Sequence, residues 1–364
     1  MAPSEAAGNR QGYRTVLLAR FSALGDVAMT VPVVYSACRC YPDVRFVLLT
    51  RPSMTSIFVD APSNLTVVGA DVKTEYKGVG GIRRLAADMV ADYSPDVFVD
   101  LHNVLRTRLL SVFLRMSGIR TARIYKPRAK RRALTRKHNK VMLPLVSQRA
   151  RYREAFFHAG LPIEDRFDGL YGGRAAADAD MFAAITLPKE DGERWVGIAP
   201  FAAHAGKIYP PDLMEKVVAR LQADVDAGER LKIFLFGGGD NERAVLDGWA
   251  SRYGAVWSLA GKRYGFKAEL ALLNHLDAMV SMDSANMHLG AIAGTPTISI
   301  WGATHPYCGF KGWRQTDDSA IQLPLSCRPC SVFGDKPCFR GDLLCLSAIR
   351  PDMIYNKIRQ TIDG

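Results

Sequence analysis

The sequence predicts an α/β protein with two Rossmann-like domains, each built on a parallel sheet, that face each other across a cleft. Its 364 residues suffice for two domains with sizeable cores. Strand-like and helix-like segments alternate along the first half, and this order predicts βαβ units and hence a parallel sheet. A weakly patterned segment, 172–194, interrupts the alternation, which then restarts in the second half.

The first domain is expected to span 13–180, after a disordered tail at 1–12. Short apolar runs predict its strands, and apolar positions at helical spacing predict the helices between them. Pro32 is compatible with an early turn of a helix. The predicted strands are 15–20, 45–50 and 96–101, and the predicted helices are 27–40, 82–93 and 106–118.

The second domain is expected to span 181–350, followed by a closing helix at 351–364. Ligands of open α/β sheets bind outside the carboxyl ends of the strands, so the loops after the strands are the expected site. The predicted elements are strand 195–200, helix 211–225, a strand entering a glycine turn at 231–239, helix 268–276, strand 278–282, helix 284–294 and strand 296–302.

The composition is that of a soluble globular protein, with 48% hydrophobic and 23% charged residues. No apolar run is long enough to span a bilayer, and the first residues, MAPSEAAGNRQG, lack the apolar core of a signal peptide. A cytoplasmic protein is therefore expected.

The charge balance is basic, with 48 Lys and Arg against 36 Asp and Glu, and it favours anionic partners. The charge is uneven, because the segment 120–140 holds ten Lys and Arg and no acid. This segment is either a solvated loop or a surface that receives phosphate groups. Both interpretations stay open at this point.

Asp26 stands near the start of a helix-like stretch just after the first predicted strand, in the run SALGD at 22–26. One interpretation is structural, with Asp26 or Ser22 accepting hydrogen bonds from the free N–H groups of a helix start. The other is chemical, because a carboxylate in a strand-end loop can act as a general base. Polar side chains also end the strand at 96–101 and are expected to face the cleft, namely Asp100, His102, Asn103 and Arg106.

Three stretches of the second half suit a phosphorylated ligand. Strand 278–282 ends before Asp283 and Ser284, two good N-cap residues, and the free N–H groups of the following helix start bind phosphate well. His288 lies one turn further on, and a capped helix with a core histidine is the structural alternative. Lys207 follows strand 195–200, where a lysine can neutralise a diphosphate. The glycine turn FGGGDNE, 236–242, allows close approach of a ligand, and Asp240 or Glu242 is suited to accept hydrogen bonds from ribose hydroxyls.

Four of the seven cysteines are clustered, at Cys327, Cys330, Cys338 and Cys345. The spacing C-x2-C-x7-C-x6-C suits a tetrahedral thiolate site, and a structural zinc ion is one interpretation. Free thiols in a compact irregular segment are the other, since disulfides are not expected in a reducing compartment.

Together these stretches resemble glycosyltransferase family 9, the heptosyltransferases of lipopolysaccharide core assembly. SALGDVAMTVPV resembles the N-terminal signature loop of the family, VDLHNVLRT its strand end with a following Arg, and IAPFAAHAGKIYP its Pro…Lys segment. The stretch 259–306 is similar, in order, to the long C-terminal signature. The resemblance runs from about residue 15 to 350, and the Asp-Ser-x-x-Met-His segment is its most specific part.

The resemblance implies a GT-B fold and an inverting transfer without a catalytic metal or other cofactor, from an ADP-sugar such as ADP-heptose. Asp26 matches the proposed general base, with Ser22 and Gly25 shaping its loop. Lys207 and the helix start at Asp283, Ser284 and Ala285 would stabilise the departing diphosphate, His288 matches a donor-contacting position, and Asp240 or Glu242 would hold the nucleoside. The acceptor side would comprise Ser22, Gly25, Asp100, His102, Asn103 and Arg106, and the basic segment adds Arg131 and Arg132.

The implied acceptor is an anionic lipid-linked glycan at the inner membrane surface, which the basic segment 120–140 would suit. Tyr209 departs from the usual Trp of the family, and Ala285 departs from a common Gly. Two alternatives remain: a family 9 enzyme that uses another nucleotide sugar on an O-chain or a glycoprotein, and a basic nucleic-acid-binding module with a zinc knuckle. Nucleic acid is not the expected partner, because only Tyr125 supplies an aromatic ring within the basic segment.

Overall fold

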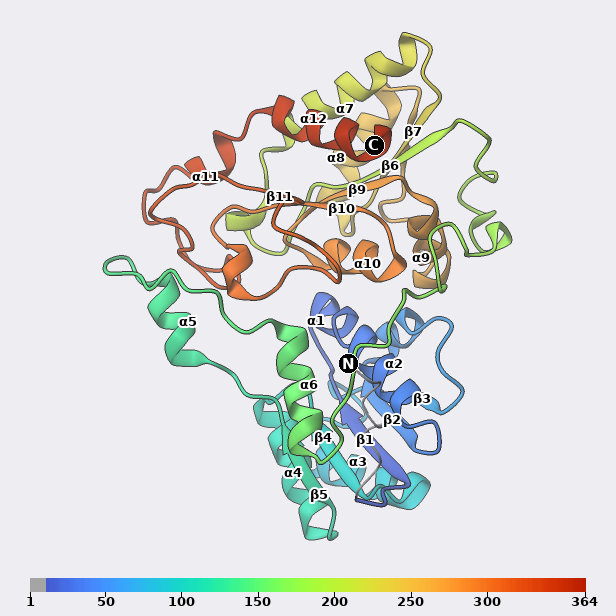
Figure 1. Ribbon diagram of the computed structural model, residues 1–364, viewed down its shortest axis with the longest axis vertical. Coiled ribbons are helices and arrows are strands. Elements are labelled where there is room, and N and C mark those ends of the chain that lie inside the picture. Colours follow the sequence, from blue (N-terminus) through green and yellow to red (C-terminus); the bar gives the residue numbers. More distant parts are fainter. Residues whose placement is uncertain (1–10) are drawn as a thin grey trace, which may run out of the picture. The chain divides into compact units, whose positions relative to one another are not determined.

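The computed structural model describes residues 11–364 as two compact units, each with its own parallel sheet (Figure 1). The first unit extends to Lys126 and also includes Val146–Asp168, and the second comprises Pro127–Leu145 and Gly169–Gly364. The first domain was expected to extend to residue 180, but residues 127–145 and 169–180 are grouped with the second unit. Of the tail expected at 1–12, all but residues 11 and 12 lies outside the described residues.

The sheet of the first unit has five parallel strands in the order β3-β2-β1-β4-β5. Ala19 at the end of β1 lies level with Asp100 at the end of β4, so the loops that follow these two strands begin side by side. The elements of this unit are β1 (Thr15–Ala19), α1 (Leu24–Ala28), α2 (Val31–Cys40), β2 (Arg45–Thr50), β3 (Leu65–Gly69), α3 (Gly78–Tyr93), β4 (Val97–Asp100), α4 (Leu105–Met116), β5 (Arg120–Arg123) and α6 (Gln148–His158).

The core of the first unit forms between its sheet and helices α3 and α4. Alternate residues of the central strands point into it, such as Leu17, Val47 and Phe98, and they meet Leu85 of α3 and Leu110 of α4. Each of these side chains is fully buried. The central strand β1 is buried along its whole length, as expected for a parallel strand with helices on both faces. The site loop after β1 therefore starts from a rigid base.

The stretch expected as one helix, 27–40, is two helices. The short α1 ends at Ala28, and α2 begins at Val31 with Pro32 in its first turn. Proline has no backbone N–H to donate and is best tolerated at a helix start, so a new helix begins beside it. The amide of Val34 accordingly donates to the carbonyl of Thr30 at 2.8 Å. This break leaves Asp26 in a helix of its own, directly after the β1 loop.

The sheet of the second unit has six parallel strands in the order β11-β10-β9-β6-β7-β8. Its core packs the sheet against α7, α8 and α12, with Met214, Leu246 and Ile358 among the fully buried side chains. The elements are α5 (Arg128–Thr135), β6 (Arg194–Ala199), α7 (Pro211–Asp226), β7 (Leu231–Leu235), α8 (Asp240–Arg252), β8 (Val256–Ser258), α9 (Phe266–His275), β9 (Ala278–Met282), α10 (Ala285–Ala293), β10 (Thr297–Ile300), β11 (Ala320–Ile321), α11 (Leu344–Ser347) and α12 (Pro351–Asp363).

The weakly patterned segment 172–194 is packed against the second unit. Phe182 is fully buried and meets the rings of Trp195 and His275 edge to face. The amide of Ala177 donates to the side chain of Asn274 in α9 at 2.9 Å. One aromatic anchor thus fixes a segment whose composition resembles a linker.

The basic segment expected at 120–140 is divided between the units. Its first part forms the edge strand β5, and its second part forms α5 and packs on the second unit. There the guanidinium of Arg131 lies over the rings of Phe310 and Phe333, at 5.7 and 5.4 Å from their centroids. The amide of Leu145 donates to the carbonyl of Tyr307 at 2.9 Å.

No helix within residues 11–364 has the length and apolar character that crossing a membrane requires.

Candidate functional site

The loop after β1 places an ion pair between Arg20 and Asp26. A terminal nitrogen of Arg20 lies 2.5 Å from Oδ2 of Asp26. The Arg20 side chain is 6% exposed, whereas that of Asp26 is 25% exposed. The carboxylate is therefore the accessible half of a largely buried pair, and a reacting group from solution can reach only this half.

Arg20 is held on several sides. Its other terminal nitrogen donates to the carbonyl of Leu101 at 3.0 Å, in the loop after β4. Burial acts to lower the pKa of Arg20, but Tyr152, Asp26 and Asp100 nearby raise it above its ordinary value. The guanidinium is consequently charged at every pH at which the protein is folded.

Tyr152 of α6 supports the same loop from the other direction. Its hydroxyl donates to the backbone carbonyl of Asp26 at 3.2 Å, and burial raises its pKa to about 12. The phenol is thus a neutral donor that holds the Asp26 backbone. The N-cap residue of α1 is Ala23, and no side chain forms a capping hydrogen bond there. The partner of the Asp26 carboxylate is Arg20.

Asp100 organises the loop after β4. Its side chain is fully buried, and Oδ1 accepts from the amides of His102 at 2.9 Å and Asn103 at 2.7 Å. Burial raises the pKa of Asp100, and those amides partly oppose the shift. Asn103 has a left-handed backbone, with φ of 52°, and its side-chain amide donates to the carbonyl of Ile124 at 2.7 Å. Both side chains have local structural partners, and their acceptor role stays a prediction.

His102 is a neutral imidazole in a cationic setting. Burial, together with the charges of Arg20, Lys126 and Arg106, lowers its pKa to about 3. Only 8% of the residue is exposed, and it lies against the ring of Phe21. A neutral histidine can hydrogen-bond to a hydroxyl but carries no charge toward an anion.

The remaining acceptor-side residues lie on different elements. Ser22 is half-buried in the β1 loop, Gly25 is in the first turn of α1, and Arg106 is exposed in the first turn of α4. Arg131 and Arg132 lie on α5, in the second unit, and Arg132 is exposed. The structure thus brings Asp26, Asp100 and His102 around Arg20, and it places Arg131 against two aromatic rings.

In the second unit Lys207 and Asp283 form a buried pair. The ammonium of Lys207 lies 2.9 Å from both Oδ2 and the backbone carbonyl of Asp283. Their side chains are 15% and 5% exposed. Lys207 ends a short 3-10 helix, Ala205–Lys207, after β6, and Asp283 follows β9, the neighbouring strand. The two strand-end loops are therefore tied together directly before the start of α10.

The N-cap of α10 is Ser284, one of the two residues expected there, but its side chain makes no capping hydrogen bond. Its hydroxyl lies 3.2 Å from that of Ser281, and Asp283 is engaged by Lys207. The first-turn N–H groups, which begin at Ala285, are thus left without a bond from the cap side chain. His288 is buried within the same helix.

The glycine turn after β7 separates the roles of Asp240 and Glu242. Oε2 of Glu242 accepts from the amide of Gly238 at 2.7 Å, so this carboxylate braces the turn. Asp240 is exposed in the first turn of α8. Gly239 before it has φ of 83°, a conformation that favours glycine. Asp240 is therefore the more accessible of the two carboxylates to a ribose.

The four clustered cysteines do not form a ligand set. All are free thiols, and within residues 11–364 no three His, Cys, Asp or Glu side chains are grouped as a metal site requires. Cys330 and Cys345 are buried, and burial raises the pKa of the Cys345 thiol to about 11. Of the two interpretations, a structural zinc ion is not confirmed and stays a prediction.

Two ionisable groups of these regions were not identified from the sequence. Arg20 was expected only as the last residue of a strand. Its position six residues before Asp26, across a turn, was a signal that could have predicted the ion pair. The other is Glu269 in the first turn of α9, where burial raises its pKa to about 7.

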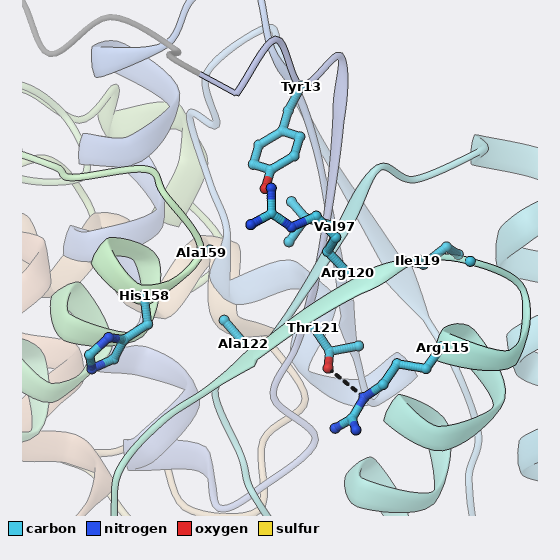
Figure 2. A pocket seen from close by; sticks show the side chains of 10 residues that line it. Tyr13, Val97, Arg115, Ile119, Arg120, Thr121, Ala122, His158 and Ala159 are labelled. Carbon is cyan, nitrogen blue, oxygen red and sulfur yellow. Dashed lines mark hydrogen bonds between the residues drawn. The ribbon is translucent and has the colours of Figure 1, made fainter.

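A cavity of about 550 Å³ in the first unit lies away from the Asp26 loop (Figure 2). It is lined by Val97, at the start of β4, and Arg120, at the start of β5. Asp26 follows the carboxyl end of β1, so the cavity and the Arg20–Asp26 pair lie at opposite edges of this parallel sheet. The cavity does not belong to the candidate site.

The family model of glycosyltransferase family 9 (heptosyltransferase) matches residues 84–336. The chain belongs to glycosyltransferase family 9. It is accordingly a glycosyltransferase, as the motifs quoted above predicted, and this membership confirms the resemblance.

Individual relatives are distant in sequence and close in fold. Lipopolysaccharide heptosyltransferase 1 of Pseudomonas aeruginosa is 25% identical over 329 residues, 86% of this chain and 85% of the relative. A family 9 glycosyltransferase of Veillonella parvula aligns with a TM-score of 0.68 at 16% identity, covering 96% of this chain and 97% of its own. The E. coli heptosyltransferase WaaC, solved with ADP, aligns with a TM-score of 0.63 at 17% identity, covering 95% and 99%. These alignments confirm the expected GT-B fold.

Replacing Glu269 by Gln is expected to stabilise the protein at neutral and alkaline pH. The folded protein holds the Glu269 proton to about pH 7, whereas the ordinary pKa is 4.5, so stability is lost as the pH rises between these values. Glutamine keeps the shape without the buried charge and should raise the free energy of unfolding by about 1–3 kcal/mol above pH 7. Denaturant unfolding at pH 8 and pH 4 measures this, and an equal gain at both values would contradict it.

Proposed function

We propose that this enzyme transfers a heptose, with inversion and without a catalytic metal, from ADP-heptose to a lipopolysaccharide core or a related cell-envelope glycan. The accessible Asp26 carboxylate beside the buried Arg20 carries the proposal, because an inverting transfer needs a base that can reach the acceptor hydroxyl. Support for the sugar and acceptor comes from the relatives, two of which are named heptosyltransferases.

Asp26 acts on the acceptor. Its carboxylate takes the proton of a sugar hydroxyl while that oxygen attacks the anomeric carbon of the donor. The new C–O bond forms as the bond between the anomeric carbon and the diphosphate breaks, and ADP leaves with the electron pair. Arg20 fixes one oxygen of Asp26 at 2.5 Å and holds the loop after β4 through Leu101, which orients the other oxygen for this transfer.

The second unit binds the donor. In this proposal the first-turn N–H groups of α10 face the developing negative charge with no competing cap side chain, and Lys207 pairs with Asp283, two residues before the helix begins. Because Asp283 accepts from Lys207, part of the lysine charge is balanced before the donor arrives, and the N–H groups carry a larger share of the stabilisation. Asp240 holds the ribose, while Glu242 keeps the glycine turn in shape.

A family 9 enzyme that uses a different nucleotide sugar is the second candidate. Ala285 favours it, because a methyl group stands at the first position of α10, where the donor phosphates would lie. The bond-forming chemistry at Asp26 would be the same, so the two candidates differ only in what the second unit binds.

The donor is tested by thermal unfolding with nucleotide sugars and free nucleotides. ADP-heptose and ADP should raise the melting temperature, because a ligand that binds only the folded state stabilises it, by about 2.7 kcal/mol at a hundredfold excess over Kd. ADP-glucose, GDP-sugars and UDP-sugars serve as matched controls. A rise with GDP or UDP compounds alone would select the second candidate, and no rise with any compound would contradict a donor site.

Asp26→Asn is expected to lower kcat by about 10²- to 10⁴-fold, because the amide cannot accept the acceptor proton. The ADP-induced rise in melting temperature should be unchanged, since donor binding is assigned to the other unit. Glu242→Gln provides the contrast, because it should weaken ADP binding and leave kcat less affected. Full activity of Asp26→Asn on a lipopolysaccharide acceptor would remove Asp26 from the mechanism.

Arg20→Met is expected to lower kcat and to leave the ADP-induced rise in melting temperature unchanged, whereas Arg20→Lys should lower kcat less. The guanidinium contacts both the Asp26 carboxylate and the carbonyl of Leu101, and Lys keeps the charge beside Asp26 without the second hydrogen bond. Measuring kcat and the ADP-induced rise for wild type and both variants separates a misplaced carboxylate from a general loss of structure. A wild-type kcat in Arg20→Met would show that Arg20 does not position Asp26.

A further inference from the structure

Helix α4 has a second apolar face that no other part of its unit covers. Leu105 is 84% exposed, Val112 48% and Met116 78%. At about 100° per residue these three side chains fall within about 40° of one another around the helix axis. The opposite face is the core face, where Thr107, Leu110, Ser111 and Leu114 are buried. The exposed stripe is therefore additional to the face that folding requires.

Cations border this stripe on both sides. By the same helical spacing Arg106 lies on one flank and Arg108 and Arg115 on the other, all three are exposed, and α4 contains no acid. The wider stretch 101–153 contains 16 Lys and Arg and no Asp or Glu. The other 311 residues carry 32 Lys and Arg against 36 Asp and Glu. The whole excess of positive charge thus comes from the part of the chain that contains α4.

The cavity of Figure 2 lies at the carboxyl end of the same helix. Its lining includes Arg115, Arg120 and His158, and Arg115 donates to the hydroxyl of Thr121 at 2.8 Å. Phe157, next to His158, is 64% exposed. A cationic hollow of about 550 Å³ is large enough for a phosphate-bearing headgroup. The exposed Met116 follows Arg115 in the chain, and the exposed Phe157 precedes His158.

We propose that the outward face of α4 docks the protein on an anionic lipid surface, with Leu105, Val112 and Met116 in the apolar layer and the cavity at Arg115 and Arg120 receiving a headgroup phosphate. Apolar stripes bordered by Lys and Arg are typical of helices that lie in the interface plane of a membrane. A second copy of the chain suits the stripe less well, because a two-fold contact would oppose the same arginines.

This inference deepens the proposed function, on which its biological sense rests, since a lipid-linked acceptor lies at such a surface. The binding itself involves no sugar and can be measured without the reaction. A failure to bind lipid would leave the ADP and Asp26 experiments unaffected, and a failure of those experiments would leave the lipid result standing.

The test is cosedimentation of the full chain with vesicles of phosphatidylcholine alone and of phosphatidylcholine mixed with phosphatidylglycerol. Wild type should bind the mixed vesicles more tightly, and added salt should weaken that binding. The double variant Leu105→Ser, Met116→Ser should bind at least about tenfold more weakly, because each removed side chain forfeits its transfer into the apolar layer. Leu187→Ser is the matched control, since Leu187 is 77% exposed in the second unit.

Equal melting temperatures for the variants and wild type would show that each compared protein is folded. Binding of the double variant equal to wild type, or wild-type binding indifferent to phosphatidylglycerol, would overturn the proposal. Light scattering distinguishes a lipid-binding face from a contact between two copies of the chain. A wild-type molar mass that falls to the monomer value in the double variant would make the α4 face a contact between copies, which also overturns it. A second arm with inorganic phosphate asks whether the cavity takes the free anion, and a Kd unchanged by the double variant is expected.

Discussion

The ion pair of Arg20 and Asp26 is the interaction on which the first unit's site depends. It is formed between Arg20, directly after β1, and a helix that begins four residues later, so it closes the loop that carries the carboxylate. Leu101 accepts from the same guanidinium and Tyr152 donates to the Asp26 backbone, so β4 and α6 hold the loop as well. Removing one partner of such a buried pair leaves the other charge uncompensated, and the arrangement therefore persists as a whole or not at all.

The second unit solves an equivalent problem with the charges exchanged. Here the cation, Lys207, is the group proposed to serve the ligand, and Asp283 lies 2.9 Å from it. The Lys207–Asp283 pair joins the loops that follow the adjacent parallel strands β6 and β9, and the Arg20 guanidinium joins the β1 loop to the loop after the adjacent strand β4 through the carbonyl of Leu101. A parallel sheet brings such loops to one edge, so two short contacts suffice to place functional groups from segments distant in sequence.

The placement of these residues was predictable, because strand-end positions follow from the alternation of elements and because Asp26, Lys207 and Asp283 each come soon after a predicted strand. The partners of these residues were not predictable to the same degree. Arg20 belongs to the apolar run by position, and only the turn of the loop brings it back to Asp26. Glu242 and Asp100 were expected to face ligands, but each has a backbone amide within hydrogen-bonding distance, and sequence spacing does not distinguish the two uses.

The cysteine spacing shows a different limit. A C-x2-C pattern sets how far apart two sulfurs can be, whereas a metal site also needs the remaining ligands to converge, which depends on the path of the whole segment. The segment 172–194 shows the converse case, since one buried ring, Phe182, decided its packing and average composition concealed it.

The grouping of 127–145 with the second unit has a consequence for the modularity of the enzyme. The first unit is discontinuous along the chain, because it resumes at Val146 with the helix that supplies Tyr152. During synthesis its sheet emerges before that helix, and a ribosome must add residues of the other unit before the Asp26 loop can acquire its last support. A single cut anywhere in the chain therefore cannot release a complete first unit, and exchange of one unit between family members requires three junctions.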